Sequence, residues 1–173
     1  MKTARDLAEY VEDGATCLPP RISIEEVVDQ ISALHAGSNG ATVSMYFGDM
    51  SGKPGFAVSL FPGRTSFVLG DALTKQRLAA FIIENVDFLL ADPRHCIGTW
   101  YDQEGDVSYI DITAVVPESG LAMDLAVWYN QVAIYDLAKQ VVTPAGGTGE
   151  ELPGWPPEAE RLPPLQRKGI DNE

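Results

Sequence analysis

The chain has 173 residues, of which 45% are hydrophobic. This length and composition predict one domain with a core of its own and exclude a collagen-like chain, a disulfide scaffold and a wholly disordered chain. Twelve Lys and Arg residues stand against 25 Asp and Glu residues, which gives a formal net charge of −13. Because such a charge repels phosphate groups, we expect no direct binding to nucleic acid or to an anionic membrane. A protein partner, basic or DNA-binding, is compatible with the charge.

The cysteines and the N-terminal residues indicate in which cellular compartment the protein is expected. Cys17 and Cys96 are the two cysteines, too few for a disulfide framework, which favours a reducing environment. Residues 1–6 lead into charged positions without the apolar stretch of a secretory signal. The longest nearly apolar run, residues 78–83, is far shorter than the ~20 residues of a membrane span. We therefore expect a cytoplasmic protein.

The best-marked helix is predicted over residues 24–36, where apolar residues recur at helical spacing. Ser23 and Glu26 form a capping box, in which the serine hydroxyl and the glutamate side chain satisfy amides of the first turn. Gly37 is suited to the left-handed conformation that ends a helix. The sequence thus predicts both ends of this helix.

A second long helix is predicted over about residues 72–91, with Asp71 or Thr74 as its cap. Its apolar face is broad, which indicates a helix laid across a sheet. Two shorter helices are predicted over residues 3–13 and 120–129.

Short runs of β-branched and aromatic residues predict the strands. They cover residues 41–47, 56–61, 65–69, 96–101, 107–116, 132–136 and 140–143. Turn residues between the first three predict an antiparallel meander, and those at 102–106 predict a hairpin. The sequence therefore predicts a single α+β domain over residues 1–143, a mainly antiparallel sheet of five to seven strands with the two long helices packed on one face.

The composition changes at Pro144. The 30 residues from 144 to 173 hold six of the twelve prolines and five of the sixteen glycines. Such a segment buries little apolar surface to offset its ordering entropy, so we expect a disordered, acidic, Pro/Gly-rich tail. Trp155 lies among prolines and is a candidate anchor for a polyproline II ligand segment. The alternative is a tail packed across its own domain.

Catalytic and metal-binding patterns are not evident in the sequence. His35 and His95 are the two histidines, and no pair of cysteines has the spacing of a zinc site. The carboxylates at 102–106 lack the loop of a calcium site. The glycine-rich residues 146–149 do not lead into a helix, as a phosphate-binding loop does. We therefore expect no catalytic residue, no cofactor and no metal.

The predicted hairpin carries the best candidates for an interaction surface. Strand alternation places Tyr109 and Asp111 on one face, and Trp100 and Tyr101 lie on the neighbouring strand. An exposed aromatic group there is typical of a recognition surface. Asp111 could instead face solvent, or act as a general base. With Trp155 from the tail, these residues are the candidate interaction surface.

Residues 97–102 (Ile-Gly-Thr-Trp-Tyr-Asp), 129–137 and 146–149 resemble a pattern found in uncharacterised proteins associated with phages and mobile elements. The resemblance extends over about residues 96–149, roughly a third of the chain. That group has no known activity to carry over. What the resemblance implies is a small accessory protein made in a bacterial cytoplasm.

The sequence as a whole favours a protein-binding accessory factor of phage or mobile-element type that acts on a host protein without catalysis. One alternative is an acidic DNA mimic that inhibits a DNA-binding defence protein. Another is a small hydrolase or nucleotide-handling enzyme that uses strand carboxylates such as Asp111.

Overall fold

A computed structural model of the chain describes residues 7–13 and 17–165. Within them the α-helices are α1 (Leu7–Asp13), α2 (Ile24–Ser38), α3 (Lys75–Ala91) and α4 (Ser119–Trp128). The strands are β1 (Gly40–Ser44), β2 (Gly48–Asp49), β3 (Phe56–Ser59), β4 (Ser66–Leu69), β5 (His95–Asp102), β6 (Val107–Val116), β7 (Ala133–Asp136) and β8 (Val141–Pro144). Two short 3₁₀ turns are η1 (Pro62–Arg64) and η2 (Glu158–Glu160). The predicted α+β class is confirmed.

The two long helices begin at side-chain caps. The Ser23 hydroxyl accepts a hydrogen bond from the Glu26 amide at 3.2 Å, and Thr74 caps α3 in the same way. The predicted end of α2 is corrected, because the helix continues through Gly37 to Asn39, which takes a left-handed φ of 61°. Asparagine tolerates this conformation because its short polar side chain can bond locally.

The strands form one mainly antiparallel sheet in the order β2-β1-β5-β6-β3-β7-β8, with β4 also paired to β6. The predicted meander is wrong, because β1, β3 and β4 pair with later strands and, among the described pairings, not with one another. β5 pairs with one edge of β6 along its length. The other edge is shared, with β4 beside residues 107–110 and β3 beside residues 113–116. The chain leaves the sheet between them, so this edge of β6 is interrupted at Asp111 and Ile112.

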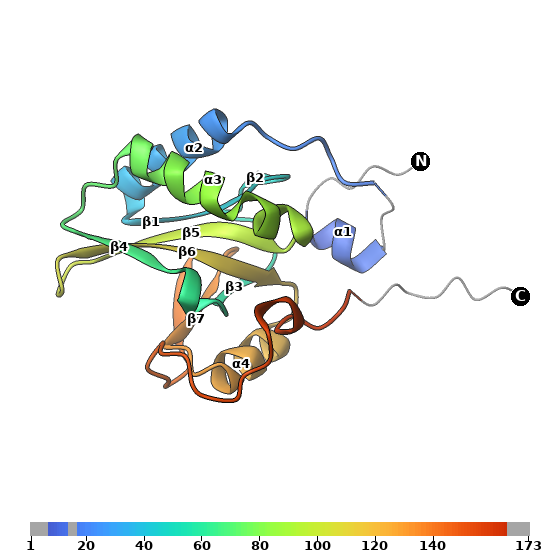
Figure 1. Ribbon diagram of the computed structural model, residues 1–173. Coiled ribbons are helices and arrows are strands. Elements are labelled where there is room, and N and C mark those ends of the chain that lie inside the picture. The colour runs from blue at the N-terminus through green and yellow to red at the C-terminus, as the bar shows by residue number, and fades with distance from the viewer. Residues whose placement is uncertain (1–6, 14–16, 166–173) are drawn as a thin grey trace, which may run out of the picture.

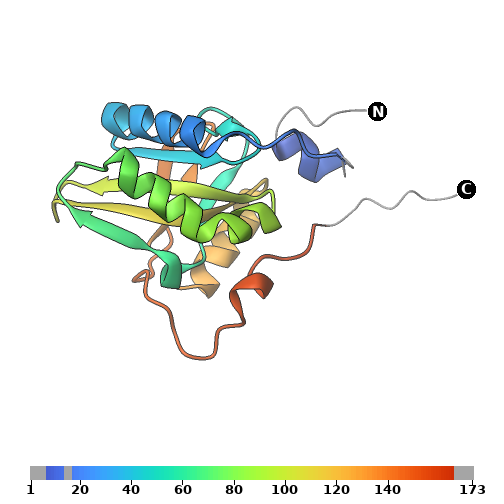
Figure 2. The same ribbon diagram turned by 45° about the horizontal axis from the view of Figure 1, so that its top comes forward.

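All three longer helices share one apolar core with the sheet. α2 and α3 lie side by side over β1 and β5, and α4 packs against β3 and β7 where the sheet curls (Figures 1 and 2). Ile31 of α2, Ile82 of α3, Ala126 of α4 and Ile112 of β6 are fully buried in this core. The prediction that the two long helices cover one face is confirmed.

The opposite face of the sheet is covered at one end. There α1 packs through Leu7 against a smaller apolar cluster that includes Met50, Cys96 and Val115. Figure 1 shows α1 at the right-hand end of the sheet and the turn between β5 and β6 at the left. Toward that turn, side chains on this face are exposed to solvent, and we call this region the open face.

The segment that follows β8 departs from the disorder expected beyond Pro144. Residues 145–165 are ordered and run along the domain past α4 (Figure 2). Leu162 is buried in the main core, and Arg161, only 4% exposed, donates a hydrogen bond to the Leu60 carbonyl. The ordered structure therefore extends to residue 165 instead of ending at 143. Residues 166–173, on which the rest of that prediction falls, lie outside the described residues.

No α-helix in residues 7–13 or 17–165 has both the length and the hydrophobicity that crossing a bilayer requires.

Candidate interaction surface

Four large side chains from three adjacent strands gather on the open face. The register places Phe67 of β4 opposite Tyr109 of β6, and Tyr109 opposite Trp100 of β5. Leu69 lies two residues beyond Phe67 and therefore on the same face. Phe67 is 61% exposed, Leu69 82% and Trp100 58%. We call Phe67, Leu69, Trp100 and Tyr109 the aromatic patch.

The patch is held by the sheet and by ring stacking. The Trp100 and Tyr109 rings are nearly parallel, with centroids 6.0 Å apart and an interplanar angle of 19°. Both residues lie within paired strands, so the backbone fixes where the rings project. Exposed aromatic rings on a rigid sheet lose little side-chain entropy when a partner covers them, which is typical of strong interaction sites.

Asp111 lies on the same face, next to the patch along β6. Directly opposite, β5 has Gly98, and the Asp111 and Thr113 side chains fill the space above it so closely that a Cβ atom there would collide with both. The Asp111 carboxylate accepts one hydrogen bond from the Thr113 hydroxyl at 3.0 Å and one from the Ser59 hydroxyl at 2.9 Å. Glycine at 98 is therefore needed for the carboxylate to lie flat against the sheet.

In the part of the chain that the structure describes, the carboxylate of Asp111 pairs with no cationic side chain. Although the residue is only partly buried, the loss of surrounding water raises its pKa above the ordinary value, and the two hydroxyl donors offset this only in part. Two neutral donors thus hold a charge that the fold itself does not neutralise.

We expect Asp111→Asn to raise the free energy of unfolding at pH 7 by about 1 kcal/mol, the size common for a stabilising single substitution. Because the folded-state pKa of Asp111 is raised, folding disfavours the charged form, and asparagine removes that cost. The advantage of the variant should shrink as the pH falls through the raised pKa and vanish well below 3.8, the ordinary value. Urea unfolding of wild type and Asp111→Asn from pH 3 to pH 8 measures this difference in the free energy of unfolding. A loss of stability at pH 7 would instead assign Asp111 a structural role.

More carboxylates gather at the end of the sheet that carries the β5–β6 turn. They are Asp71, Asp102, Glu104 and Asp106, and three of them, Asp106, Asp71 and Asp102, raise the pKa of the Tyr101 phenol on the helix-facing side. The Gly70 amide donates to the Asp106 carbonyl at 2.7 Å, which brings the end of β4 against this turn. The resulting negative rim favours a partner with basic side chains around an apolar centre.

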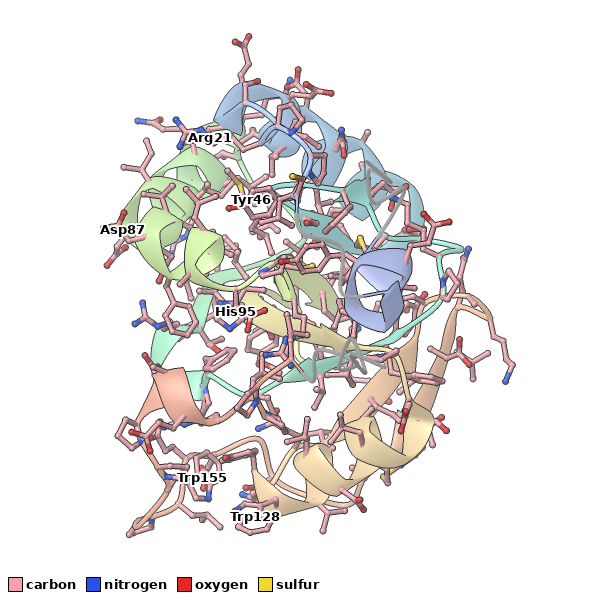
Figure 3. The ribbon with its side chains drawn as sticks, turned by 90° about the vertical axis from the view of Figure 1, so that its right-hand side faces the viewer. Arg21, Tyr46, Asp87, His95, Trp128 and Trp155 are labelled. Carbon is pink, nitrogen blue, oxygen red and sulfur yellow. The ribbon has the colours of Figure 1, made fainter. Side chains whose placement is uncertain are left out.

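Two of the five candidate residues, Tyr101 and Trp155, lie apart from this surface. Tyr101 alternates to the helix-facing side, and its hydroxyl donates to Asp106 at 2.8 Å. Trp155 lies in the C-terminal segment, where its ring makes an edge contact with Tyr129 at 5.2 Å. Figure 3 shows Trp155 near the C-terminal end of α4. Its role is to attach that segment to the domain.

Phe67 and Leu69 are the patch residues that sequence reasoning missed. Alternation along the run from 65 to 69 places both on one face, which is the available signal. The pattern does not say which strand lies beside them, and only the pairing of β4 with β6 brings them next to Tyr109.

The Cys96 thiol and both histidine rings are engaged in packing. Burial raises the pKa of Cys96 to about 12, so its thiol stays protonated at neutral pH. His35 contacts the hydroxyl groups of Thr99 and Ser108, and His95 stacks on Phe88 with centroids 4.4 Å apart. Burial lowers the pKa of both histidines, so the neutral imidazole is favoured. Within the described residues, no three potential ligands gather into a metal site.

A polar hollow of about 650 Å³ lies away from the open face. It is lined by η1, the start of β4, α3 and η2, and includes Arg64, Arg77 and Glu84. Arg64 is already engaged there, since it donates to Glu158 at 2.7 Å and to Asn85 at 3.0 Å. Asp111 does not line this hollow, so its carboxylate is not aimed at a ligand bound there.

No family model, no curated protein and no solved structure matches this chain.

Proposed function

We propose that the chain is a protein-binding accessory factor of phage or mobile-element type, which binds a host protein through the open face and catalyses no reaction. The observation that carries the proposal is the aromatic patch, three of whose side chains are more than half exposed on a rigid sheet. Aromatic groups of this size are the usual centres of protein interfaces, and a solvent-exposed cluster of them is costly without a partner.

The surroundings of the patch match the expected anatomy of an interface. Its centre is aromatic and apolar, while the rim toward the β5–β6 turn is acidic. The rim increases the association rate with a basic partner and disfavours acidic ones. The mobile-element and host assignments rest on the resemblance over residues 96–149.

The test compares two exposed tryptophans on different sides of the molecule. Immobilised wild type, Trp100→Ala and Trp128→Ala are exposed to extract of the cells that naturally make the protein. Trp128 is 73% exposed on α4 and is the matched control. We expect one partner to be retained by wild type and by Trp128→Ala, and to bind Trp100→Ala at least tenfold more weakly, as for a central interface tryptophan. Equal retention by all three would refute the open face as the binding surface.

An acidic decoy that inhibits a DNA-binding defence protein is the second candidate, favoured by the gathering of Asp71, Asp102, Glu104 and Asp106. The two functions differ in which substitution matters. For a decoy, the triple variant Asp102→Asn, Glu104→Gln, Asp106→Asn should abolish binding while Trp100→Ala is tolerated. For the aromatic interface, the triple variant should mainly slow association and Trp100→Ala should abolish binding.

A further inference from the structure

We propose that Asp111 and the Trp100–Tyr109 ring pair form a receptor for one arginine side chain of the partner protein. The inference rests on the proposed function and names the chemical group that the open face recognises.

The Asp111 carboxylate has free hydrogen-bond acceptor positions for a guanidinium group. A carboxylate accepts about four hydrogen bonds, and the Ser59 and Thr113 hydroxyls supply one to each oxygen. Each oxygen of Asp111 therefore keeps one acceptor position, and two parallel acceptors match the two N–H groups of a guanidinium. The hydroxyl donors also fix the carboxylate, so little order is lost when a cation binds.

The aromatic rings lie at a suitable separation from the carboxylate. Tyr109 and Asp111 are two residues apart on the same face of β6, which places them about 7 Å from each other along the strand. A guanidinium bound to Asp111 can therefore extend its alkyl stem or its planar face over Trp100 and Tyr109. Cations gain most from the face of tryptophan.

The protein uses the same combination of groups inside its own fold. The guanidinium of Arg64 lies 4.0 Å from the centre of the Phe88 ring while it donates to Glu158 at 2.7 Å. Arg161 likewise lies 5.2 Å from the centre of the Trp155 ring and donates to Glu151 at 2.7 Å. In both places a carboxylate and an aromatic ring hold one arginine. The open face has the carboxylate and the rings, and the cation is the group that a partner would add.

Arginine is favoured over lysine by the geometry. Lysine presents a compact, strongly hydrated ammonium, whereas the guanidinium is planar, stacks on rings and donates two parallel hydrogen bonds. The net charge of −13 attracts a basic segment as a whole, and the aromatic rings next to Asp111 select the planar cation within it.

The test is an NMR titration of the isotope-labelled full chain with N-acetyl-arginine methylamide. The counterparts made from lysine and from citrulline, which is uncharged but nearly isosteric, serve as comparison probes. We expect saturable shifts at the Trp100 indole and at the Gly98 and Thr113 amides, with a dissociation constant on the order of 1–10 mM for one side chain. Citrulline should give no saturable shift, and lysine should bind at least fivefold more weakly.

Variants locate the binding. Asp111→Asn should weaken arginine binding at least tenfold, whereas Asp124→Asn, which removes the same charge from the exposed side of α4, should leave it unchanged. Unchanged binding by Asp111→Asn, equal binding of citrulline or of lysine, or the absence of saturation would each overturn the inference. Asp111→Ser repeats the test if the asparagine variant does not fold.

The two proposals fail separately. If Trp100→Ala abolishes partner capture but the arginine probe does not bind, the interface stands and the arginine receptor is refuted. If the probe binds at Asp111 but Trp100→Ala still captures the partner, the receptor stands and the proposed function is refuted.

Discussion

Replacing Phe61 with alanine should lower the free energy of unfolding by about 4 kcal/mol, the usual size for a fully buried aromatic residue. Phe61 is fully buried. Its ring packs edge-on against Phe88, with centroids 4.9 Å apart, and against His95 at 5.2 Å. Without the ring, a cavity remains beneath the segment that connects β3 and β4. The expected loss of unfolding free energy therefore includes the lost apolar burial, the lost ring contacts and the cost of the cavity.

Phe67→Ala is the matched control, because it makes the same replacement on the open face. Phe67 is 61% exposed, so Phe67→Ala should change the free energy of unfolding of the protein by no more than about 0.5 kcal/mol. Urea unfolding of both variants measures the difference. A loss below about 1.5 kcal/mol for Phe61→Ala would mean that the neighbouring side chains collapse into the space, and that this residue does not anchor the segment.

The contrast between these two phenylalanines illustrates what the sequence predicts and what it does not. Phe61 ends the strand-like run 56–61 and Phe67 lies within the run 65–69, and alternation along each run assigns the side chain to one face of a strand. Whether a face is covered depends on which elements pack against it, and that is decided by residues far away in the chain. The helices are local in origin, since apolar spacing and caps such as Ser23 and Thr74 act within a few residues. The bounds of α2, α3 and α4 lie within about three residues of the predicted ones, while residues 3–6 of the first predicted helix lie outside the described residues.

Strand pairing was the part that local patterns could not determine. The runs at 41–47, 56–61 and 65–69 are close in the sequence, and nearby strands often pair directly. In the structure, β6 takes both β3 and β4 on one edge, and Phe61 is buried in the core between them. This arrangement also produces the interruption of that edge beside Asp111. The surroundings of the candidate residue thus depend on tertiary packing that the sequence pattern does not encode.

The candidate site was predicted in part for the same reason. Alternation within one strand correctly placed Tyr109 and Asp111 together, and the hairpin brought Trp100 beside them. Tyr101 follows Trp100 directly, so it points to the other face. The missing members, Phe67 and Leu69, come from a strand whose partner was predicted incorrectly.

The order of residues 145–165 comes from hydrogen bonds that composition does not reveal. Proline cannot donate a backbone hydrogen bond, but its carbonyl and those of its neighbours can accept one. Arg94 donates to the Pro163 carbonyl at 2.7 Å, and Arg161 donates to the Pro156 carbonyl at 3.2 Å. Arginine side chains therefore help to order this proline-rich segment, together with the apolar contacts of Leu162 and Trp155.

Replacing Arg161 with alanine should lower the free energy of unfolding by about 3 kcal/mol and release the C-terminal segment. The guanidinium donates to the Leu60 carbonyl at 2.8 Å and to the Glu151 carboxylate at 2.7 Å, and its side chain is 3% exposed. Alanine leaves the buried carbonyl groups without a donor, and each such loss costs about 1–3 kcal/mol. The contact with the Trp155 ring is lost as well.

Hydrogen exchange across residues 145–165, followed by mass spectrometry, separates release of the segment from general destabilisation. In Arg161→Ala these amides should exchange far faster than those of β5 and β6, whereas in Arg77→Ala they should exchange as in wild type. Arg77 is the matched control because its side chain is exposed and, among the hydrogen bonds of the described residues, it bonds to Ser66 and to the Phe67 carbonyl and not to the segment. Arg161→Lys should resemble the alanine variant, since one ammonium cannot reach three acceptors held in the geometry of a guanidinium. Slow exchange of residues 145–165 in Arg161→Ala would show that proline packing and Leu162 hold the segment without the arginine, and that its order follows from apolar contacts after all.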